Sequence, residues 1–365
     1  MSRHDERAHR MDMSLPQTIP GITPNWLTQA LAVRYPGVRV ERIEIKDVIK
    51  GTSTKIRVAL EYAGNLREVC PPHSLIVKGG FEAHSQWMAG MYMNEMRFYR
   101  DIRPYIDMNT PACYYAGSNP QSYQSIVILE DLKTKNVVFQ DPLVPSRYDQ
   151  VARRLEAMAR YHAQTWDSPE FAPGGKFDWI TTRYEGFGKI FIARYLEPER
   201  WNHFMHQPRG AAVSVRLHDR DWMAHALHML EEQHDHMPRC VIHGDTHLGN
   251  LYLETDGTPG FLDAQCCRAP WVMDVNYHII AACDVPDRRM WETSLLAHYL
   301  DALRQNGIDA PNFQEAWEAY KRETANGYFI FVINESHFQT EAVNTAIAAR
   351  FGAAALDFDL IGLLS

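Results

Sequence analysis

Polar and apolar residues alternate along three segments near the N-terminus, and this period of two is typical of half-buried β-strands. The segments are residues 38–51, 53–62 and 73–80. The first two meet at the sequence Gly-Thr-Ser-Thr of residues 51–54, which favours a turn. Residues 113–117 and 125–132 predict two further strands, so the first third of the chain is expected to form a small antiparallel sheet.

Two helices are expected in the same region. Thr23 followed by Pro24 is a typical helix start, because threonine caps the first N–H groups and proline suits the first turn. Apolar residues then recur at helical spacing until Pro36-Gly37 ends the pattern. A second apolar face predicts a helix over roughly residues 85–100, supplied by Trp87, Met88, Met91, Met96 and Phe98.

Beyond Leu132 the apolar period becomes helical, with a long helix expected from about Ser146 and others over much of residues 185–235 and toward the C-terminus. Residues 240–265 interrupt this pattern with strand, loop, strand, turn and strand. The order predicts an α+β chain with a disordered tail at residues 1–20. A sheet-rich N-lobe is expected at residues 21–132 and a mostly helical C-lobe at residues 133–365.

Composition removes several classes of function. The net charge is −8 and the basic residues are scattered, so no footprint for nucleic acid is visible. No apolar run reaches the roughly 18 residues of a membrane span, and the polar N-terminus lacks the apolar stretch of a secretory signal. The six cysteines show no Cys-x-x-Cys spacing, which is typical of reduced thiols. We therefore expect a soluble cytoplasmic protein, and no feature specifies its oligomeric state.

The most informative segment is His-Gly-Asp-Thr-His-Leu-Gly-Asn at residues 243–250, followed by Phe-Leu-Asp at residues 261–263. It places the carboxylate of Asp245 and the carboxamide of Asn250 on one loop, and a second carboxylate, Asp263, across a predicted hairpin. Phosphoryl transfer needs such a set, because one carboxylate orients the attacking hydroxyl while other oxygen ligands hold Mg²⁺ against the phosphates.

These motifs resemble the aminoglycoside phosphotransferase and choline kinase superfamily, whose members have a two-lobed protein-kinase-like fold. The resemblance implies an ATP- and Mg²⁺-dependent kinase with a small-molecule hydroxyl acceptor. It implies Asp245 as the catalytic base and Asn250 and Asp263 as metal ligands. His243 would brace the loop, and Asp274 would support it at the start of the next helix.

The same resemblance assigns the N-lobe to the nucleotide. A lysine on the third strand is needed for the phosphates, and a glutamate on the following helix holds it. Lys78 and Glu95 stand in these places. Taken alone, each would be an ordinary exposed residue.

Two weaker assignments complete the expected nucleotide site. Gly51, Thr52 and Ser53 lie where a glycine-rich phosphate loop would be, although a plain β-turn suits them equally well. Glu130 and Leu132 match the backbone positions that pair with the adenine edge in the resembling families.

The order of motifs over roughly residues 20–340 is similar to that of the ecdysteroid-kinase-like branch. Among them are Asn-Glu-Met-Arg-Phe-Tyr-Arg at residues 94–100 and the sequence Ile-Leu-Glu-Asp-Leu at residues 128–132. One departure is Asp263-Ala264-Gln265, where that branch commonly has Asp-Phe-Gln. The change removes an aromatic packing element but keeps the predicted metal ligand.

The acceptor is the least determined part. Residues 175–235 carry eight basic and nine acidic residues, so no acidic pocket for a polycation stands out, and the segment is rich in aromatic side chains. A neutral, lipophilic alcohol is therefore expected. The alternatives are an aminoglycoside- or choline-type kinase and a non-catalytic binding protein. A metallophosphoesterase is excluded, because the blocks it needs beside Gly-Asp-Thr-His are missing.

Overall fold

The computed structural model describes residues 14–64, 71–119 and 121–365, which fall into two compact units. Within this part of the chain the first unit comprises residues up to Tyr105 together with Thr110–Val137. The second comprises Ile106–Asn109 and Val138–Ser365. No helix of the described residues is long and apolar enough to cross a membrane.

The first unit is built on one antiparallel sheet whose strands lie in the order β1-β2-β3-β5-β4. The strands are β1 (Val40–Ile49), β2 (Thr54–Tyr62), β3 (Ser74–Gly79), β4 (Cys113–Ser118) and β5 (Ser125–Glu130). All five strands were predicted, β1, β2 and β3 from the period of two and β4 and β5 as two further strands. In the pairing of β2 with β3, Thr54 lies opposite Gly79 and Lys55 lies opposite Lys78.

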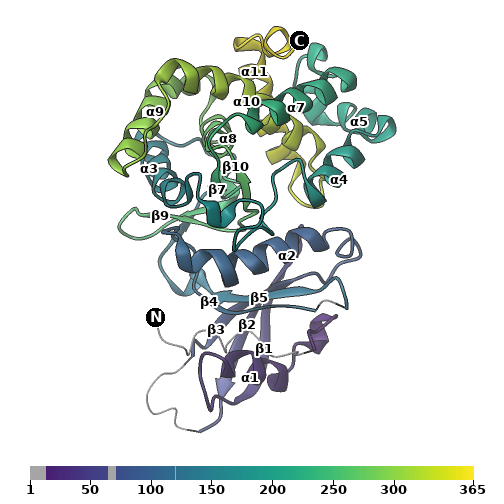
Figure 1. The fold of residues 1–365 in the computed structure, drawn as a ribbon. Coiled ribbons are helices and arrows are strands. Elements are labelled where there is room, and N and C mark those ends of the chain that lie inside the picture. Colours follow the sequence, from purple (N-terminus) through teal and green to yellow (C-terminus); the bar gives the residue numbers. More distant parts are fainter. Residues whose placement is uncertain (1–13, 65–70, 120) are drawn as a thin grey trace. The chain divides into compact units, whose positions relative to one another are not determined.

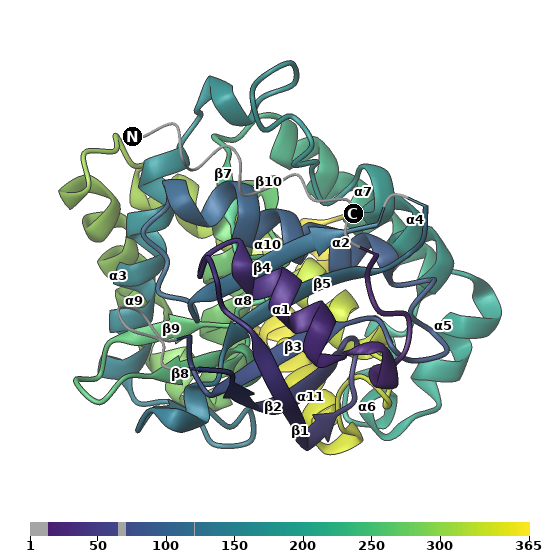
Figure 2. The same ribbon diagram turned by 90° about the horizontal axis from the view of Figure 1, so that it is seen from below.

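One helix packs on each face of this sheet, as Figure 1 shows. Helix α1 (Pro24–Ala32) begins at Thr23, whose side chain accepts the N–H of Trp26, as the sequence predicted. Its apolar side chains pack against alternate residues of the strands to form a core, and Figure 2 shows α1 lying across the strands. Helix α2 (Ala89–Arg97) contacts β4 and β5 on the other face.

Two predictions for this unit need correction. The helix expected over residues 85–100 begins only at Ala89 and passes at Phe98 into a wider π-helical turn, Phe98–Ile102. The expected tail at residues 1–20 lies mostly outside the described residues, but Leu15 is 3% exposed and belongs to the core around α1. The chain is therefore packed from about residue 15, because an apolar side chain follows the charged terminal segment.

The second unit is mostly helical and surrounds one buried helix, α8 (Val272–Ala282), every residue of which is buried. Its neighbours are α3 (Tyr148–Thr165), α9 (Val285–Gln305), α10 (Phe313–Ile333) and α11 (Glu341–Asp357). The remaining helices are α4 (Gly186–Tyr195), α5 (Pro198–Met205), α6 (Pro208–Ala211), α7 (Arg220–Asp235) and α12 (Leu360–Leu363). The polar side chains of α8, Asp274, Asn276 and His278, all make hydrogen bonds, which is what allows them to lie in the core.

The second unit contains short strands within residues 240–265, the segment for which strands were predicted. Strands β8 (Leu251–Leu253) and β9 (Pro259–Phe261) form the predicted hairpin, and β6 (Val138–Phe139) pairs with β8. The first strand of the segment, β7 (Cys240–Ile242), does not join them. It pairs with β10 (Cys267–Ala269), a three-residue strand too short to produce a recognisable pattern.

Candidate active site

The loop of residues 243–250 leaves β7 through a turn that only glycine allows. Gly244 has a φ of 82°, in the region that disfavours a side chain. A Cβ atom there would also lie 2.3 Å from the carbonyl oxygen of Gln265. The loop can therefore approach the segment after β9 closely only because this position is a glycine.

Asp274, in the first turn of α8, anchors the beginning of this loop. Its Oδ2 accepts the N–H of His243 at 2.8 Å and the hydroxyl of Tyr161 at 2.7 Å. Its Oδ1 accepts the N–H of Gly244 at 2.9 Å, and the Nε2 atom of His162 lies 3.3 Å from Oδ2. Burial opposes the charged form, yet the pKa of the Asp274 carboxyl is lowered, mainly by the hydrogen bond with His162 and also by the one from Tyr161. A buried carboxylate thus holds the two backbone groups where the loop starts.

His243 braces the loop against the strand that leads to Asp263. Its Nε2 lies 2.8 Å from the carbonyl oxygen of Leu262, and its Nδ1 lies 3.2 Å from the N–H of Asp245. Because Nδ1 accepts, Nε2 carries the proton and donates. Burial lowers the pKa of the His243 imidazole, so the ring stays neutral and suits this bracing contact.

Backbone hydrogen bonds join the same loop to the segment that carries Asp263. The N–H of Leu262 donates to the carbonyl oxygen of Asn250 at 2.8 Å, and the N–H of Gln265 donates to that of His243 at 2.9 Å. Asp263 itself has a φ of 57°, a left-handed conformation that aspartate tolerates better than most residues. The two segments that bear the predicted carboxylates and carboxamide are therefore bound together directly.

Asp245 is held at both of its carboxylate oxygens. The Nδ2 atom of Asn250 donates to Oδ2 at 2.8 Å and also to the carbonyl oxygen of Asp245 at 3.0 Å. The hydroxyl of Tyr277 donates to Oδ1 at 2.8 Å. The Nε2 atom of His247 lies 3.8 Å from Oδ2, and the Asp245 side chain remains 31% exposed. The carboxylate is thus oriented and still accessible.

Sequence reasoning missed Tyr277 and His247. A signal existed for Tyr277, since it follows Asp274 by three residues and must share a face of α8 with it. Nothing in the sequence indicated that Tyr277 contacts Asp245, because the two residues are 32 positions apart.

The donors present fit Mg²⁺. Because Nδ2 of Asn250 faces Asp245, the amide oxygen is turned away from that carboxylate and is available as a ligand. Asp263 supplies a carboxylate, and such hard oxygen atoms are the ligands that Mg²⁺ prefers, with waters and phosphates completing the shell. No cluster of three or more His, Cys, Asp or Glu side chains suited to a metal occurs among the described residues. The fit therefore rests on one carboxylate and one carboxamide.

In the first unit, the structure brings Lys78 and Glu95 together. The Nζ atom of Lys78 lies 2.6 Å from Oε1 and 2.5 Å from Oε2 of Glu95. Both residues are only 4% exposed, whereas each taken alone in the sequence resembled an exposed residue. Position 78 faces away from the core formed with α1, so the lysine points to the side where α2 packs.

The loop between β1 and β2 is fastened by its backbone. The carbonyl oxygen of Thr52 accepts the hydroxyl of Tyr92 at 2.6 Å and lies 3.1 Å from Nε2 of His84. Ser53 is buried, and Gly51 is not in a left-handed conformation. These contacts describe an ordinary hairpin turn with a fixed position, and they leave its predicted phosphate contacts as a prediction.

The predicted adenine-binding positions lie at the end of β5. Glu130 donates its N–H to the carbonyl oxygen of Ala112 at 2.8 Å, and its side chain pairs with Lys135 at 2.7 Å. Leu132 is buried and opens a short 3₁₀ turn capped by Asp131. Their contact with adenine remains a prediction.

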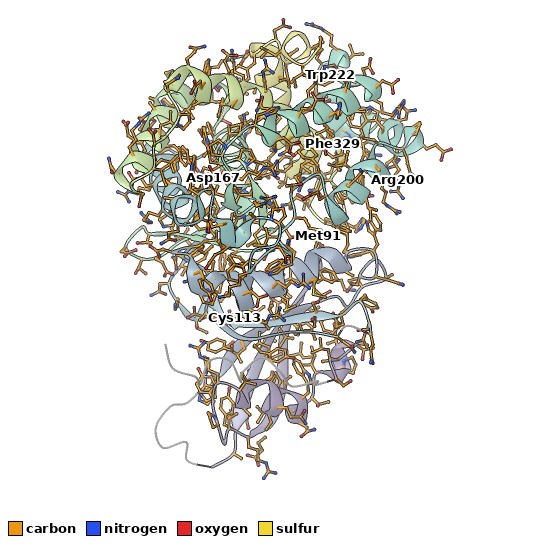
Figure 3. The ribbon with its side chains drawn as sticks, in the orientation of Figure 1. Met91, Cys113, Asp167, Arg200, Trp222 and Phe329 are labelled. Carbon is orange, nitrogen blue, oxygen red and sulfur yellow. The ribbon has the colours of Figure 1, made fainter. Side chains whose placement is uncertain are left out.

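Two features of the second unit bear on the acceptor. One of the three tryptophans in the segment 175–235, Trp201, is buried and stacks on Phe329, which Figure 3 labels within the helical unit. In contrast, Phe187 and Phe191 of α4 are only half-buried, and their rings lie 6.0 Å apart. Most, but not all, of the aromatic side chains behind the predicted lipophilic pocket thus belong to the core.

The second feature is an acidic pocket of about 350 Å³ beside α5. It is lined by Glu197, Glu199, Arg200, His203, Phe204 and Glu335. Arg200, labelled in Figure 3, is the only Lys or Arg among these residues. The sequence indicated no such pocket, because Glu335 comes from the chain after α10, far from the segment whose charges were counted.

Comparison with known proteins agrees with this geometry. A sequence model described as the phosphotransferase enzyme family matches residues 84–322, well over half of the chain. The ethanolamine kinase of Plasmodium vivax has a similar fold, with a TM-score of 0.52 and 12% identity over 86% of this chain and 82% of that one. A search of curated proteins finds no match.

Two other solved structures resemble the chain more loosely. For the GDP and kanamycin complex of APH(2″)-IIia the TM-score is 0.49, with 10% identity over 84% of this chain and 89% of that one. For a choline kinase of Streptococcus pneumoniae the values are 0.47 and 12%, over 91% and 98%. The fold is the two-lobed α+β protein-kinase-like fold that the motifs predicted. The chain belongs to the phosphotransferase enzyme family and is a small-molecule kinase that acts on a hydroxyl group.

Proposed function

We propose that this kinase transfers the γ-phosphate of ATP to a hydroxyl group, with Mg²⁺ as cofactor and Asp245 as the catalytic base. The observation that carries the proposal is the arrangement of Asp245. Both of its oxygens are oriented by donors, while its side chain stays accessible. Its loop is also hydrogen-bonded to the segment that carries Asp263.

In this proposal Asp245 orients the acceptor hydroxyl and takes its proton as the new O–P bond forms and the bond to the ADP oxygen breaks. Asn250 and Asp263 would hold Mg²⁺, which supplies positive charge against the phosphates when bound. Lys78, fixed by Glu95, would pair with the α- and β-phosphates. Residues 21–132 would thus serve the nucleotide, and residues 133–365 the catalytic loop and the acceptor.

For the acceptor we propose a lipophilic alcohol, as in the ecdysteroid-kinase-like branch that the motif order resembles. The half-buried rings of Phe187 and Phe191 and the exposed side chain of Ile190 support it, because they offer apolar surface along α4. Apolar ligand surface removed from water contributes about 25 cal/mol per Å².

A second candidate is an alcohol that carries an amino group, like the ethanolamine in the name of one structural relative. The acidic pocket favours it, since Glu197, Glu199 and Glu335 outnumber Arg200 there. Carboxylates placed in this way favour a cationic ligand and disfavour an anionic one.

A phosphoryl-transfer screen tests the proposal. Wild type and Asp245→Asn are offered γ-labelled ATP, Mg²⁺ and a library containing lipophilic alcohols, choline, ethanolamine and kanamycin. We expect transfer by the wild type, and a loss of roughly 100-fold or more in kcat for Asp245→Asn, since the amide cannot take the proton. Near wild-type turnover by this variant would remove Asp245 from its role. The highest kcat/KM decides between the two acceptor classes.

A further inference from the structure

A tyrosine on the buried helix α8 contacts the predicted catalytic carboxylate. The hydroxyl of Tyr277 donates to Oδ1 of Asp245 at 2.8 Å, and Tyr277 is only 5% exposed. We propose that Tyr277 is a positioning residue, which holds the carboxylate of Asp245 in the orientation that accepts a proton from the acceptor. The inference rests on the proposed function, because it assigns a second residue to the same reaction.

The contact is directional. Burial, together with the negative charge of Asp245 and the hydrogen bond to it, raises the pKa of Tyr277 well above its ordinary value. The hydroxyl therefore stays protonated at neutral pH and acts as a donor to the carboxylate.

Tyr277 and Asn250 each donate a hydrogen bond to a different oxygen of the Asp245 carboxylate. Tyr277 holds Oδ1, and Nδ2 of Asn250 holds Oδ2. With one donor on each oxygen, rotation of the carboxylate about its Cβ–Cγ bond would break both hydrogen bonds. Each oxygen can accept two donors, so the pair still leaves room for an acceptor hydroxyl.

The ring of Tyr277 is itself fixed from two helices. It stacks on Phe331 of α10, with centroids 5.3 Å apart and planes 26° apart, and its centroid lies 5.9 Å from that of Phe351 of α11. Phe331 and Phe351 also stack on each other. Gly327 makes room for this cluster, since a Cβ atom there would lie 2.0 Å from the ring of Phe351.

This support lies at the end of α10 next to the acidic pocket. Phe331 lies in the last turn of α10, and Glu335 of the acidic pocket follows the same helix by two residues. His247 of the loop also packs its ring against Phe331, with centroids 5.9 Å apart. The base is therefore positioned by the helix end that leads into the acidic pocket.

The decisive variant is Tyr277→Phe, which keeps the stacked ring and removes only the hydroxyl. The matched control is Tyr328→Phe, because Tyr328 is also buried and donates to a backbone carbonyl, that of Leu217, at 2.9 Å. The probe is MgATP with water as the acceptor. We expect kcat to fall roughly 10- to 100-fold for Tyr277→Phe, with the KM for ATP within twofold. Tyr328→Phe should keep kcat within twofold, and a Tyr277→Phe kcat within twofold of wild type overturns the inference.

A second measurement needs no turnover. Thermal unfolding is compared for wild type, Tyr277→Phe, Asp245→Ala and the double variant. If the hydroxyl of Tyr277 binds the carboxylate, Tyr277→Phe should lower the Tm less in the Asp245→Ala variant than in the wild type. Additive Tm shifts would overturn the contact. A wild type without any phosphoryl transfer would overturn the proposed function, while the Tm cycle would still decide the role of Tyr277.

Discussion

Replacing Asp274 by asparagine should detach the start of the catalytic loop. The side chain is 1% exposed and accepts hydrogen bonds from the N–H groups of His243 and Gly244 and from the hydroxyl of Tyr161, besides the longer contact with His162. Asparagine has the same shape but only one acceptor oxygen. If that oxygen takes the place of Oδ2, the new NH₂ group faces the N–H of Gly244. Both groups are donors, so this hydrogen bond is lost.

The size of the effect follows from these contacts. A hydrogen bond to a charged group contributes about 1.5–3 kcal/mol, and an unsatisfied buried donor costs about 1–3 kcal/mol. One bond is lost and two lose their charge, so Asp274→Asn should lower the free energy of unfolding by about 3–4 kcal/mol. Most domains are stable by about 5–15 kcal/mol, so the variant should still fold at 25 °C.

Urea unfolding followed by tryptophan fluorescence at pH 7.5 measures this loss. The matched control is Asp301→Asn on α9. The Asp301 side chain is 66% exposed and pairs with Arg304, so this substitution should change the free energy of unfolding by less than about 0.5 kcal/mol. The pKa of Asp274 is lowered by folding, so its contribution is complete above the unfolded value near 4 and is lost only as pH falls further. The difference between the variants should hence be constant from about pH 5.5 to 8. A loss below about 1 kcal/mol with an unchanged m-value would refute the anchoring role.

Two other predictions concern the metal and pH. Asp263→Asn should raise the Mg²⁺ concentration for half-maximal turnover roughly 10-fold or more, and asparagine tolerates the left-handed backbone at this position. Asn250→Ala should raise that concentration less, because a carboxylate binds the cation more strongly than a carboxamide does. Asp256→Asn in the exposed hairpin turn is the control, and an unchanged Mg²⁺ requirement in both site variants would place the metal elsewhere. Burial lowers the pKa of His278 to about 3, whereas its pKa in the unfolded chain is near 6.5. The stability due to its neutral form is therefore complete above about pH 6.5, and the free energy of unfolding should fall by about 2 kcal/mol between about pH 7.5 and 5. Urea midpoints over this range should fall less steeply for His278→Asn, and parallel curves would contradict the assignment.

The sequence was sufficient where local pattern decides the structure. Strands β1, β2 and β3 follow from alternation along their segments, and α1 begins at Thr23 because a threonine cap and a proline are adjacent there. The ion pair of Lys78 and Glu95 could be anticipated from their order relative to the loop at residues 243–250. Their burial could not, because each residue taken alone is polar and matches an exposed position.

Long-range contacts set the limit. The pairing of β7 with β10 was missed, because three residues carry too little pattern to define a strand. The hydroxyl of Tyr277 reaches Asp245 only because α8 packs behind the loop, and no local rule contains that packing. Even the close approach that makes Gly244 necessary depends on Gln265, whose position is set by tertiary structure.

This difference explains why the chemistry of the reaction was easier to infer than its acceptor. Asp245 and Asn250 lie within one loop, so their spacing alone predicts a carboxylate beside a metal ligand. The acidic pocket instead joins α5 to the chain after α10, and a count over residues 175–235 necessarily omits Glu335. The catalytic groups must keep one geometry for phosphoryl transfer, whereas an acceptor site is assembled from helices whose surface residues are free to vary. We therefore expect acceptor choice to depend on tertiary packing, which no single segment of the sequence describes.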